Sequence, residues 1–208
     1  VDTGDLFVSR NAGNLVPPPD APSGEPATIE YAVTTLGVTD IIICGHYRCG
    51  AVRAILYPQE AVGLTKTNEW LAHAAETRAV IQQEHPGLEG EMLWDKAVER
   101  NALLQVKNIS KHPAVAAALA VGTVRLHAWV LRFETSEVLA FDPKSNTFVP
   151  LLDMPVVHAA LPVPIQPSVE SGEVALPKLS RSPVAPGWLN VFKSDIPASL
   201  VVFAIALP

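Results

Sequence analysis

The residues with the clearest chemical potential lie in one short stretch, residues 41–50, which reads IIICGHYRCG. His46 and Cys49 are three positions apart, so a helical turn or a tight loop would point both side chains to one place. An imidazole and a thiolate together suit Zn²⁺. A helix that begins just after Cys49 would also stabilise its thiolate, because the amino end of a helix is positively polarised. We therefore predict that His46 and Cys49 bind a divalent metal ion.

A histidine and a cysteine at this spacing are by themselves a weak metal signal, and other interpretations stay open. Cys44 fits a buried core position better than a ligand position, because free cysteines are among the most buried residue types. A redox pair of Cys44 and Cys49 would lack the Cys-x-x-Cys spacing of thiol oxidoreductases. The remaining histidines show no ligand spacing, and we interpret them as surface or packing residues: His73, His85, His112, His127 and His158.

The elements around this stretch predict an α/β fold with a mainly parallel β-sheet flanked by helices and a C-terminal hairpin. Residues 38–44 (VTDIIIC) form a β-branched run typical of a buried parallel strand. Ligands of such sheets lie beyond the carboxyl ends of the strands. Thr28 should cap a helix over 28–36, which Gly37 should end. Further strands are expected at 5–10, 123–133 and 138–141, and further helices at 51–56, 69–83, 91–108 and 113–122.

The composition indicates a globular, rather apolar protein. Of 208 residues, 49% are hydrophobic, and 15 basic against 21 acidic residues give a net charge of −6. This balance excludes a dedicated nucleic-acid-binding protein, which would show a basic stripe. Two cysteines exclude a small disulfide-stabilised scaffold. Because prolines recur through residues 152–187, we expect a folded domain at 1–151, a proline-rich linker at 152–187 and a separate apolar segment at 188–208.

Three ordered motifs resemble the β-class carbonic anhydrases. They are DTGDLFVSRNAGN at residues 2–14, IEYAV at 29–33 and CGHYRCGAV at 44–52, and the similarity continues through ERN at 99–101, LHAW at 126–129 and FDP at 141–143. The resemblance covers residues 1–151. It implies a β-carbonic-anhydrase-like fold, reversible hydration of CO₂ to bicarbonate, zinc as the cofactor, and a homodimer with the site close to the subunit contact.

Members of that family hold zinc by two cysteines and one histidine, and His46 and Cys49 match the second and third of these ligands. The first belongs to a Cys-x-Asp-x-Arg motif upstream of the Gly-Asp-Leu-Phe segment, and no such motif occurs in the 208 residues. We therefore expect the chain to be incomplete at its N-terminus, to lack the catalytic aspartate and arginine, and to be impaired as an enzyme. Arg10 and Asn11 lie at the substrate pocket or dimer contact by resemblance; the alternative is that they tie down the loop before Pro17.

Residues 188–208 resemble the entry to the first membrane helix of SulP-type anion transporters, with a core or amphipathic helix as the alternative. Together the two resemblances imply an enzyme domain coupled to an anion transporter and attached, on the cytoplasmic side, to the inner membrane. The alternative from a different functional class is a non-catalytic carbonic-anhydrase-like module that regulates or docks on such a transporter. A Cys-x-Asp-x-Arg segment upstream of Val1 in the intact gene would favour the enzyme.

Overall fold

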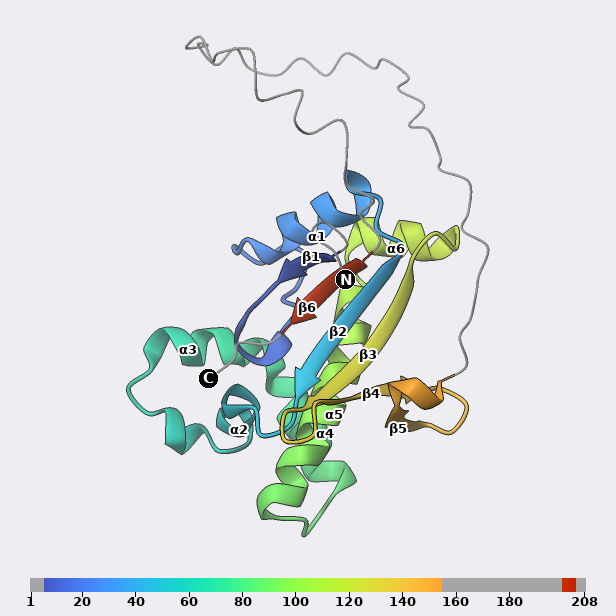
Figure 1. Ribbon diagram of the computed structural model, residues 1–208. Helices are drawn as coiled ribbons and strands as arrows, with labels where there is room; N and C mark the ends of the chain where they lie inside the picture. Colours follow the sequence, from blue (N-terminus) through green and yellow to red (C-terminus); the bar gives the residue numbers. More distant parts are fainter. Residues whose placement is uncertain (1–5, 155–199, 205–208) are drawn as a thin grey trace, which may run out of the picture. The chain divides into compact units, whose positions relative to one another are not determined.

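The computed structural model describes residues 6–154 and 200–204, which form an α/β structure around a six-stranded sheet (Figure 1). The strand order across the sheet is β1-β6-β2-β3-β4-β5. This is the α/β class that the sequence predicts. The strands are Leu6–Ser9 (β1), Asp40–His46 (β2), Arg125–Arg132 (β3), Glu137–Asp142 (β4), Thr147–Pro150 (β5) and Leu200–Ala204 (β6).

Along the strand order, the first half of the sheet is parallel and the second half is antiparallel. β2 pairs in parallel with β3, with Ile43 opposite Ala128. β6 pairs in parallel with both β1 and β2. β3, β4 and β5 follow one another by antiparallel pairing. The predicted hairpin is therefore present, and β5 extends it by a strand that the sequence pattern did not indicate.

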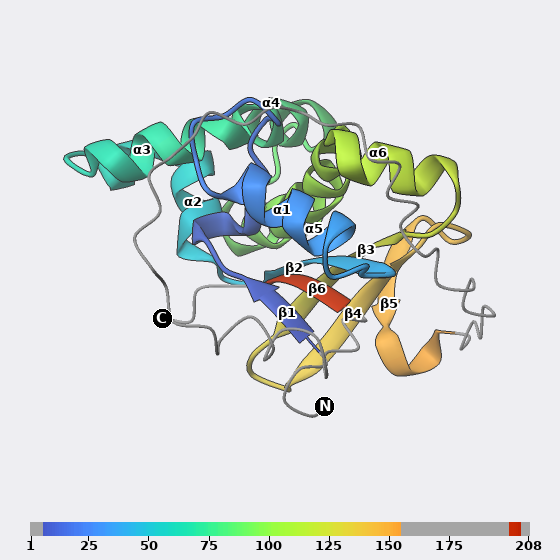
Figure 2. The ribbon, with the colours of Figure 1, turned by 90° about the horizontal axis from the view of Figure 1, so that it is seen from above.

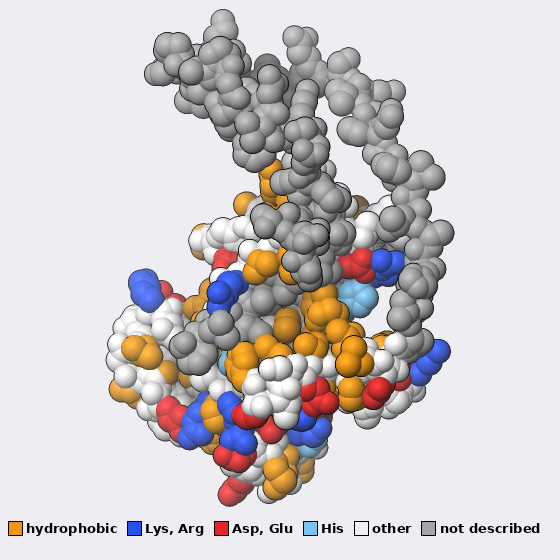
Figure 3. Space-filling model, viewed as in Figure 1, with side chains coloured by type: hydrophobic (Ala, Val, Ile, Leu, Met, Phe, Trp, Pro, Cys, Tyr) orange, Lys and Arg blue, Asp and Glu red, His pale blue; other side chains and the backbone are white. Residues whose placement is uncertain are grey.

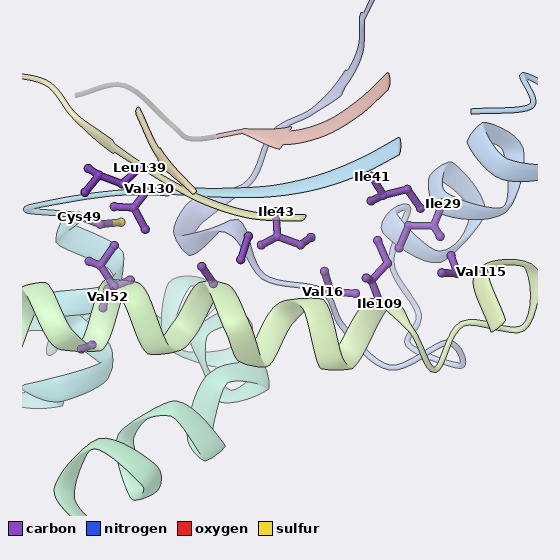
Figure 4. Packing of buried hydrophobic residues seen from close by; sticks show 14 of the residues in the cluster. Val16, Ile29, Ile41, Ile43, Cys49, Val52, Ile109, Val115, Val130 and Leu139 are labelled. Atoms are coloured by element: carbon purple, nitrogen blue, oxygen red, sulfur yellow. The ribbon is translucent and has the colours of Figure 1, made fainter. Parts of the chain in front are cut away.

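Helices lie over one face of this sheet (Figure 2). Between this layer and the sheet lies the main core, in which Ile41 and Ile43 of β2 meet apolar side chains of three helices, Ile29, Ile109 and Val115 among them (Figure 4). Each isoleucine buried in this way contributes about 1.5–3 kcal/mol. The helices are Glu25–Thr34 (α1), Gly50–Leu56 (α2), Thr65–Leu71 (α3), Ala75–Glu84 (α4), Gly90–Ile109 (α5) and Pro113–Ala120 (α6).

Three elements differ most clearly from the predictions. Helix α1 begins at Glu25, before the predicted cap, because a proline at its second position fixes the first turn. Thr28 therefore lies inside the helix, where its hydroxyl donates to a backbone carbonyl one turn earlier. Strand β2 continues to His46 and so carries the first candidate ligand itself. The helix predicted around Trp70 is divided by a 3₁₀ turn at Ala72–Ala74.

The opposite face of the sheet is apolar at its centre. Ile42 and Cys44 of β2 are buried there, with Trp129 and Leu131 of β3 packed against them. Figure 3 shows hydrophobic side chains gathered over β2 and β3 on the face in view. The expectation that Cys44 is a buried core cysteine is confirmed, and its thiol is free.

The C-terminal apolar run differs from the membrane helix that its sequence resembles. Of residues 188–208, only Leu200–Ala204 are described, and they form strand β6 between β1 and β2. Over residues 6–154 and 200–204, no helix is both long enough and apolar enough to cross a bilayer. Most of the linker expected at 152–187 lies outside the described residues.

Candidate active site

The two predicted metal-binding residues come together at the carboxyl end of β2. His46 is the last residue of β2, and Cys49 precedes the first residue of α2 after a two-residue loop. Both residues line one cavity of about 660 Å³. Much of the remaining lining consists of small or apolar residues from the loop after β1, the α2–α3 region and the turn after β3: Ala12, Gly13, Ala51, Ala54, Ala61, Leu64 and Phe133.

The imidazole of His46 is fixed in one orientation. Its Nδ1–H donates to the Tyr47 carbonyl oxygen at 2.9 Å, which leaves the lone pair on Nε2. The ring centroids of His46 and Phe133 lie 4.9 Å apart. Burial lowers the pKa of His46, and the bond to Tyr47 opposes this only in part. The ring is therefore neutral at neutral pH, which is the state in which histidine binds a metal.

Burial keeps the thiol of Cys49 protonated at neutral pH. The burial raises the pKa of Cys49, while hydrogen bonds from the backbone N–H groups of Val52 and Ala51 act in the opposite direction. These two N–H groups belong to the first turn of α2. They would stabilise a thiolate once a metal ion displaces the thiol proton.

Helix α5 supports the loop that carries both side chains. The Trp94 indole N–H donates to the Cys49 carbonyl oxygen at 2.9 Å. The Tyr47 hydroxyl donates to the Glu99 carboxylate at 2.7 Å. The Arg132 guanidinium lies over the Tyr47 ring, 5.0 Å from its centroid. The loop between β2 and α2 is thus attached to α5 on both sides of its turn.

A buried polar network that was not predicted from the sequence holds the loop after β1, which also lines the cavity. Asn101 of α5 donates through Nδ2 to the Gly13 carbonyl oxygen at 2.8 Å. Its Oδ1 accepts bonds from the Thr77 hydroxyl (2.9 Å) and the Gln105 amide (3.1 Å). Asn14 lines the cavity, and its buried Nδ2 has no hydrogen-bond partner among the described residues. An asparagine on the apolar face of a predicted helix was the signal that could have indicated this network.

Asn11 has the second of its two expected roles, which is to tie down the loop before Pro17. Its side-chain amide donates to the Leu15 carbonyl oxygen (2.9 Å) and accepts from the Leu15 N–H (2.8 Å), which closes the loop after β1. The cavity lining begins at Ala12, so neither Arg10 nor Asn11 belongs to it. A contact of Arg10 and Asn11 with a second subunit stays a prediction.

The side-chain types of His46 and Cys49 fit zinc, but two ligands are fewer than a catalytic zinc site uses. A neutral imidazole with a free Nε2 and a nearby thiol are both typical zinc ligands, and catalytic zinc sites have three protein ligands. Within the described part of the chain, no group of three or more His, Cys, Asp or Glu side chains could hold a metal ion. Among the described residues, His46 and Cys49 are thus two candidate donors, and we derive no reaction step through a metal.

A second polar cluster lies at the other end of β2. Asp40 accepts hydrogen bonds from Arg125 Nε (2.7 Å), His127 Nε2 (2.8 Å) and the Thr39 hydroxyl (2.9 Å). Burial acts to raise the pKa of Asp40, but these hydrogen bonds outweigh it and lower the pKa to about 2. His127 is therefore held beside Asp40 at the end of β2 remote from the cavity, in agreement with its interpretation as a surface or packing residue.

Comparison with known proteins relates the chain to carbonic anhydrases. The sequence model of the family described as carbonic anhydrase matches residues 1–138. The carbonic anhydrase of Synechocystis sp. is 43% identical over 152 residues, which are 71% of this chain and 55% of that protein. The carbonic anhydrase of Pseudomonas aeruginosa is 42% identical over 159 residues, 76% of this chain and 72% of that protein. The chain thus spans about half the length of the Synechocystis relative.

Solved structures give the same relationship. The β-carbonic anhydrase CcaA matches with a TM-score of 0.69 and 42% identity over 72% of this chain and 73% of that chain. A Coccomyxa β-carbonic anhydrase in complex with acetazolamide matches with a TM-score of 0.58 and 37% identity over 65% of this chain and 60% of that chain. For tetrameric β-carbonic anhydrases from Sordaria macrospora the TM-score is 0.60 at 26% identity, over 67% of this chain and 69% of that chain. The predicted β-carbonic-anhydrase fold is confirmed.

Proposed function

The chain belongs to the β-class carbonic anhydrase family, and from this we propose that it provides a domain for the reversible hydration of CO₂ to bicarbonate. The observation that carries the proposal is the position of His46 and Cys49 on the wall of one cavity. The small apolar residues around them suit CO₂, which is uncharged and has no hydrogen-bond donor.

We propose zinc as the cofactor, with His46 Nε2 and Cys49 Sγ as two of its ligands. In such enzymes zinc supplies a bound water of lowered pKa. The chain's own contribution is orientation: the Tyr47 carbonyl fixes the His46 tautomer, and the first turn of α2 donates N–H groups to the Cys49 sulfur. Because the described residues supply two donors instead of three, we expect the 208-residue chain alone to bind zinc weakly and to hydrate CO₂ slowly.

The test is the zinc content of the purified chain together with stopped-flow CO₂ hydration. We expect less than one zinc ion per chain and a rate near the uncatalysed one. One zinc per chain with fast turnover would contradict the expected impairment. In the natural gene product, H46A or C49A should lower hydration by about 100-fold or more, since even indirect supports of a metal cost 10–100-fold. Unchanged hydration in both variants would refute the enzyme proposal.

A link to an anion transporter and to the cytoplasmic side of the inner membrane is a further proposal, supported by the resemblance of residues 188–208 to a transporter entry segment. The non-catalytic regulatory module is the second candidate function, and the two-donor site favours it. Sequencing the DNA on both sides of this chain separates the two. A Cys-x-Asp-x-Arg segment upstream supports the enzyme, and its absence from the natural protein supports the module.

We also propose that the protein is a homodimer or a larger homo-oligomer. The support is the exposed apolar side chains of strand β1, where Leu6 is 36% and Val8 is 47% exposed, and the tetrameric state named for the Sordaria macrospora proteins. Sedimentation velocity at micromolar concentration tests this. A purely monomeric species would contradict it.

A further inference from the structure

The loop that joins the two candidate ligands contains a backbone conformation that its residue type disfavours. Arg48 has φ +60°, in the left-handed region, where a side chain with a Cβ is crowded against its own backbone. The other non-glycine residues with positive φ in the described ranges are Asn14, Ser136 and Asn146. Asparagine tolerates this region well. An arginine there needs a compensating interaction.

The side chain of Arg48 provides that interaction by contacting one face of α5. Its guanidinium pairs with Glu91, with Nη2 2.9 Å from Oε2. Its Nε lies 3.7 Å from Asp95 Oδ1, and its Cζ lies 5.9 Å from the centroid of the Trp94 ring. Residues 91, 94 and 95 lie one turn apart on the same helix surface. The guanidinium therefore connects the turn of the loop to the first turns of α5.

The residues on either side of Arg48 are attached to the same helix. Tyr47 donates to Glu99, and the Cys49 carbonyl accepts from Trp94. Three consecutive residues of the loop thus contact α5. The direction in which Cys49 leaves the loop depends on the backbone of the residue before it, so the left-handed turn at Arg48 determines whether the thiol faces the cavity that His46 lines.

We propose that Arg48 is a positioning residue: its contacts with α5 hold a left-handed turn that brings Cys49 and His46 to the same cavity. The inference rests on the proposed function only because it takes these two side chains as the ligands of the metal ion. It assigns to an exposed, charged residue the task of preorganising a buried pair.

The test separates the side chain of Arg48 from its backbone by comparing R48A with R48G in the full chain. R48A removes the contacts with α5 and keeps a Cβ in the left-handed region, so the loop should open more often. The readout is alkylation of Cys49 by iodoacetamide without added metal, followed by peptide mass spectrometry with Cys44 as the internal reference. We expect Cys49 in R48A to react about tenfold faster relative to Cys44. The cost of a left-handed residue, which is equivalent to about that factor, is then no longer offset by the contacts with α5. R48G should stay within about threefold of the unsubstituted chain, because glycine adopts this conformation without that cost.

Matched variants keep the result interpretable. N146A and N146G make the same pair of changes at a left-handed residue in the β4–β5 turn and should leave Cys49 unchanged. E91Q removes the ionic partner at a side chain that is 70% exposed, so it leaves the core intact and should accelerate Cys49 in the same direction as R48A.

The proposal is overturned if R48A and R48G react alike at Cys49, whether both are slow or both are fast, or if E91Q has no effect. Zinc binding measured with a competing chromophoric chelator then addresses the proposed function separately. If the alkylation pattern holds while the natural gene product binds no zinc, the loop inference stands and the metal proposal fails.

Discussion

The two ends of β2 carry polar clusters of opposite character. At the amino end, Asp40 is bonded to Arg125, His127 and Thr39, so opposite charges and hydrogen-bonding groups satisfy one another. At the carboxyl end, His46 keeps a free Nε2, Cys49 is buried, and Asn14 Nδ2 lacks a partner among the described residues. We call the Asp40 cluster, whose groups satisfy one another, the closed end of β2. The cluster at His46 and Cys49, which keeps free groups, is the open end.

This difference separates a stabilising cluster from a binding one. A closed cluster lowers the free energy of the folded state and offers nothing to a ligand. An open cluster, with strained backbone and unsatisfied donors, is maintained only where the surrounding structure holds it. At the carboxyl end that support comes from α5, which contributes Trp94, Glu99 and Asn101. The comparison predicts that substitutions of the α5 residues that support the open end affect the cavity. Substitutions at the closed end should affect only the free energy of unfolding.

The largest effect should follow from N101A. The substitution leaves the Thr77 hydroxyl, the Gly13 carbonyl and the Gln105 amide buried without their partner. We expect the free energy of unfolding to fall by about 3 kcal/mol, measured by urea denaturation. The comparison variant is N108A on the same helix, which removes a single partly buried bond at the edge of the network, from Asn108 Nδ2 to Gln105 Oε1 (3.2 Å), and should cost about 1 kcal/mol. Equal losses in N101A and N108A would contradict the larger stabilising role assigned to the buried bonds of Asn101.

A smaller effect is expected at the closed end. D40N removes the carboxylate that accepts from Arg125 and His127, and it should lower the free energy of unfolding by about 1–2 kcal/mol at neutral pH. The rate of Cys49 alkylation should not change, because the cluster lies at the other end of the strand. A change at Cys49 in D40N would break the separation of the two ends.

The same cluster predicts a pH dependence with a definite sign. In the fold the pKa of Asp40 is about 2, below its ordinary value of 3.8, so the ionised carboxylate stabilises the folded state. This contribution is present above pH 3.8 and is lost as the pH falls toward 2. The stability difference between the unsubstituted chain and D40N should therefore shrink across that window in urea titrations. A difference that stays constant would contradict the assigned pKa.

The smallest effect should come from W94F. The phenyl ring keeps an aromatic surface beneath Arg53, whose Cζ lies 5.1 Å from the Trp94 centroid, but the indole bond to the Cys49 carbonyl is lost. We expect a loss of about 1 kcal/mol in unfolding free energy and faster alkylation of Cys49. W70F loses the corresponding bond to the Ala12 carbonyl and should cost a similar amount without affecting Cys49. Identical Cys49 rates in W94F and W70F would weaken the role assigned to α5.

The sequence allowed the open end to be found but not its supports. His46 and Cys49 follow a β-branched run, and both features are local, so spacing and pattern predict where they emerge. The partners of Asn101 lie 24 residues away at Thr77 and 88 residues away at Gly13, and no periodicity encodes such pairs. The left-handed turn at Arg48 was also not predictable, because arginine carries no signal for it and the contacts with α5 form only in the folded chain.

Strand β5, which extends the predicted hairpin, was not predicted from the sequence for a related reason. β5 has four residues, Thr147–Pro150, with an ordinary composition, and it is a strand because it pairs with β4. Pairing of this kind depends on the neighbouring strand more than on intrinsic propensity.

This outermost strand has a bearing on how the protein behaves at high concentration. β5 has only four residues, and it ends in Pro150, which has no N–H to donate. A strand from another molecule would therefore find fewer backbone N–H donors along β5 than along a longer edge strand. We therefore expect the β5 side of the sheet to be a poor template for open-ended stacking into fibrils.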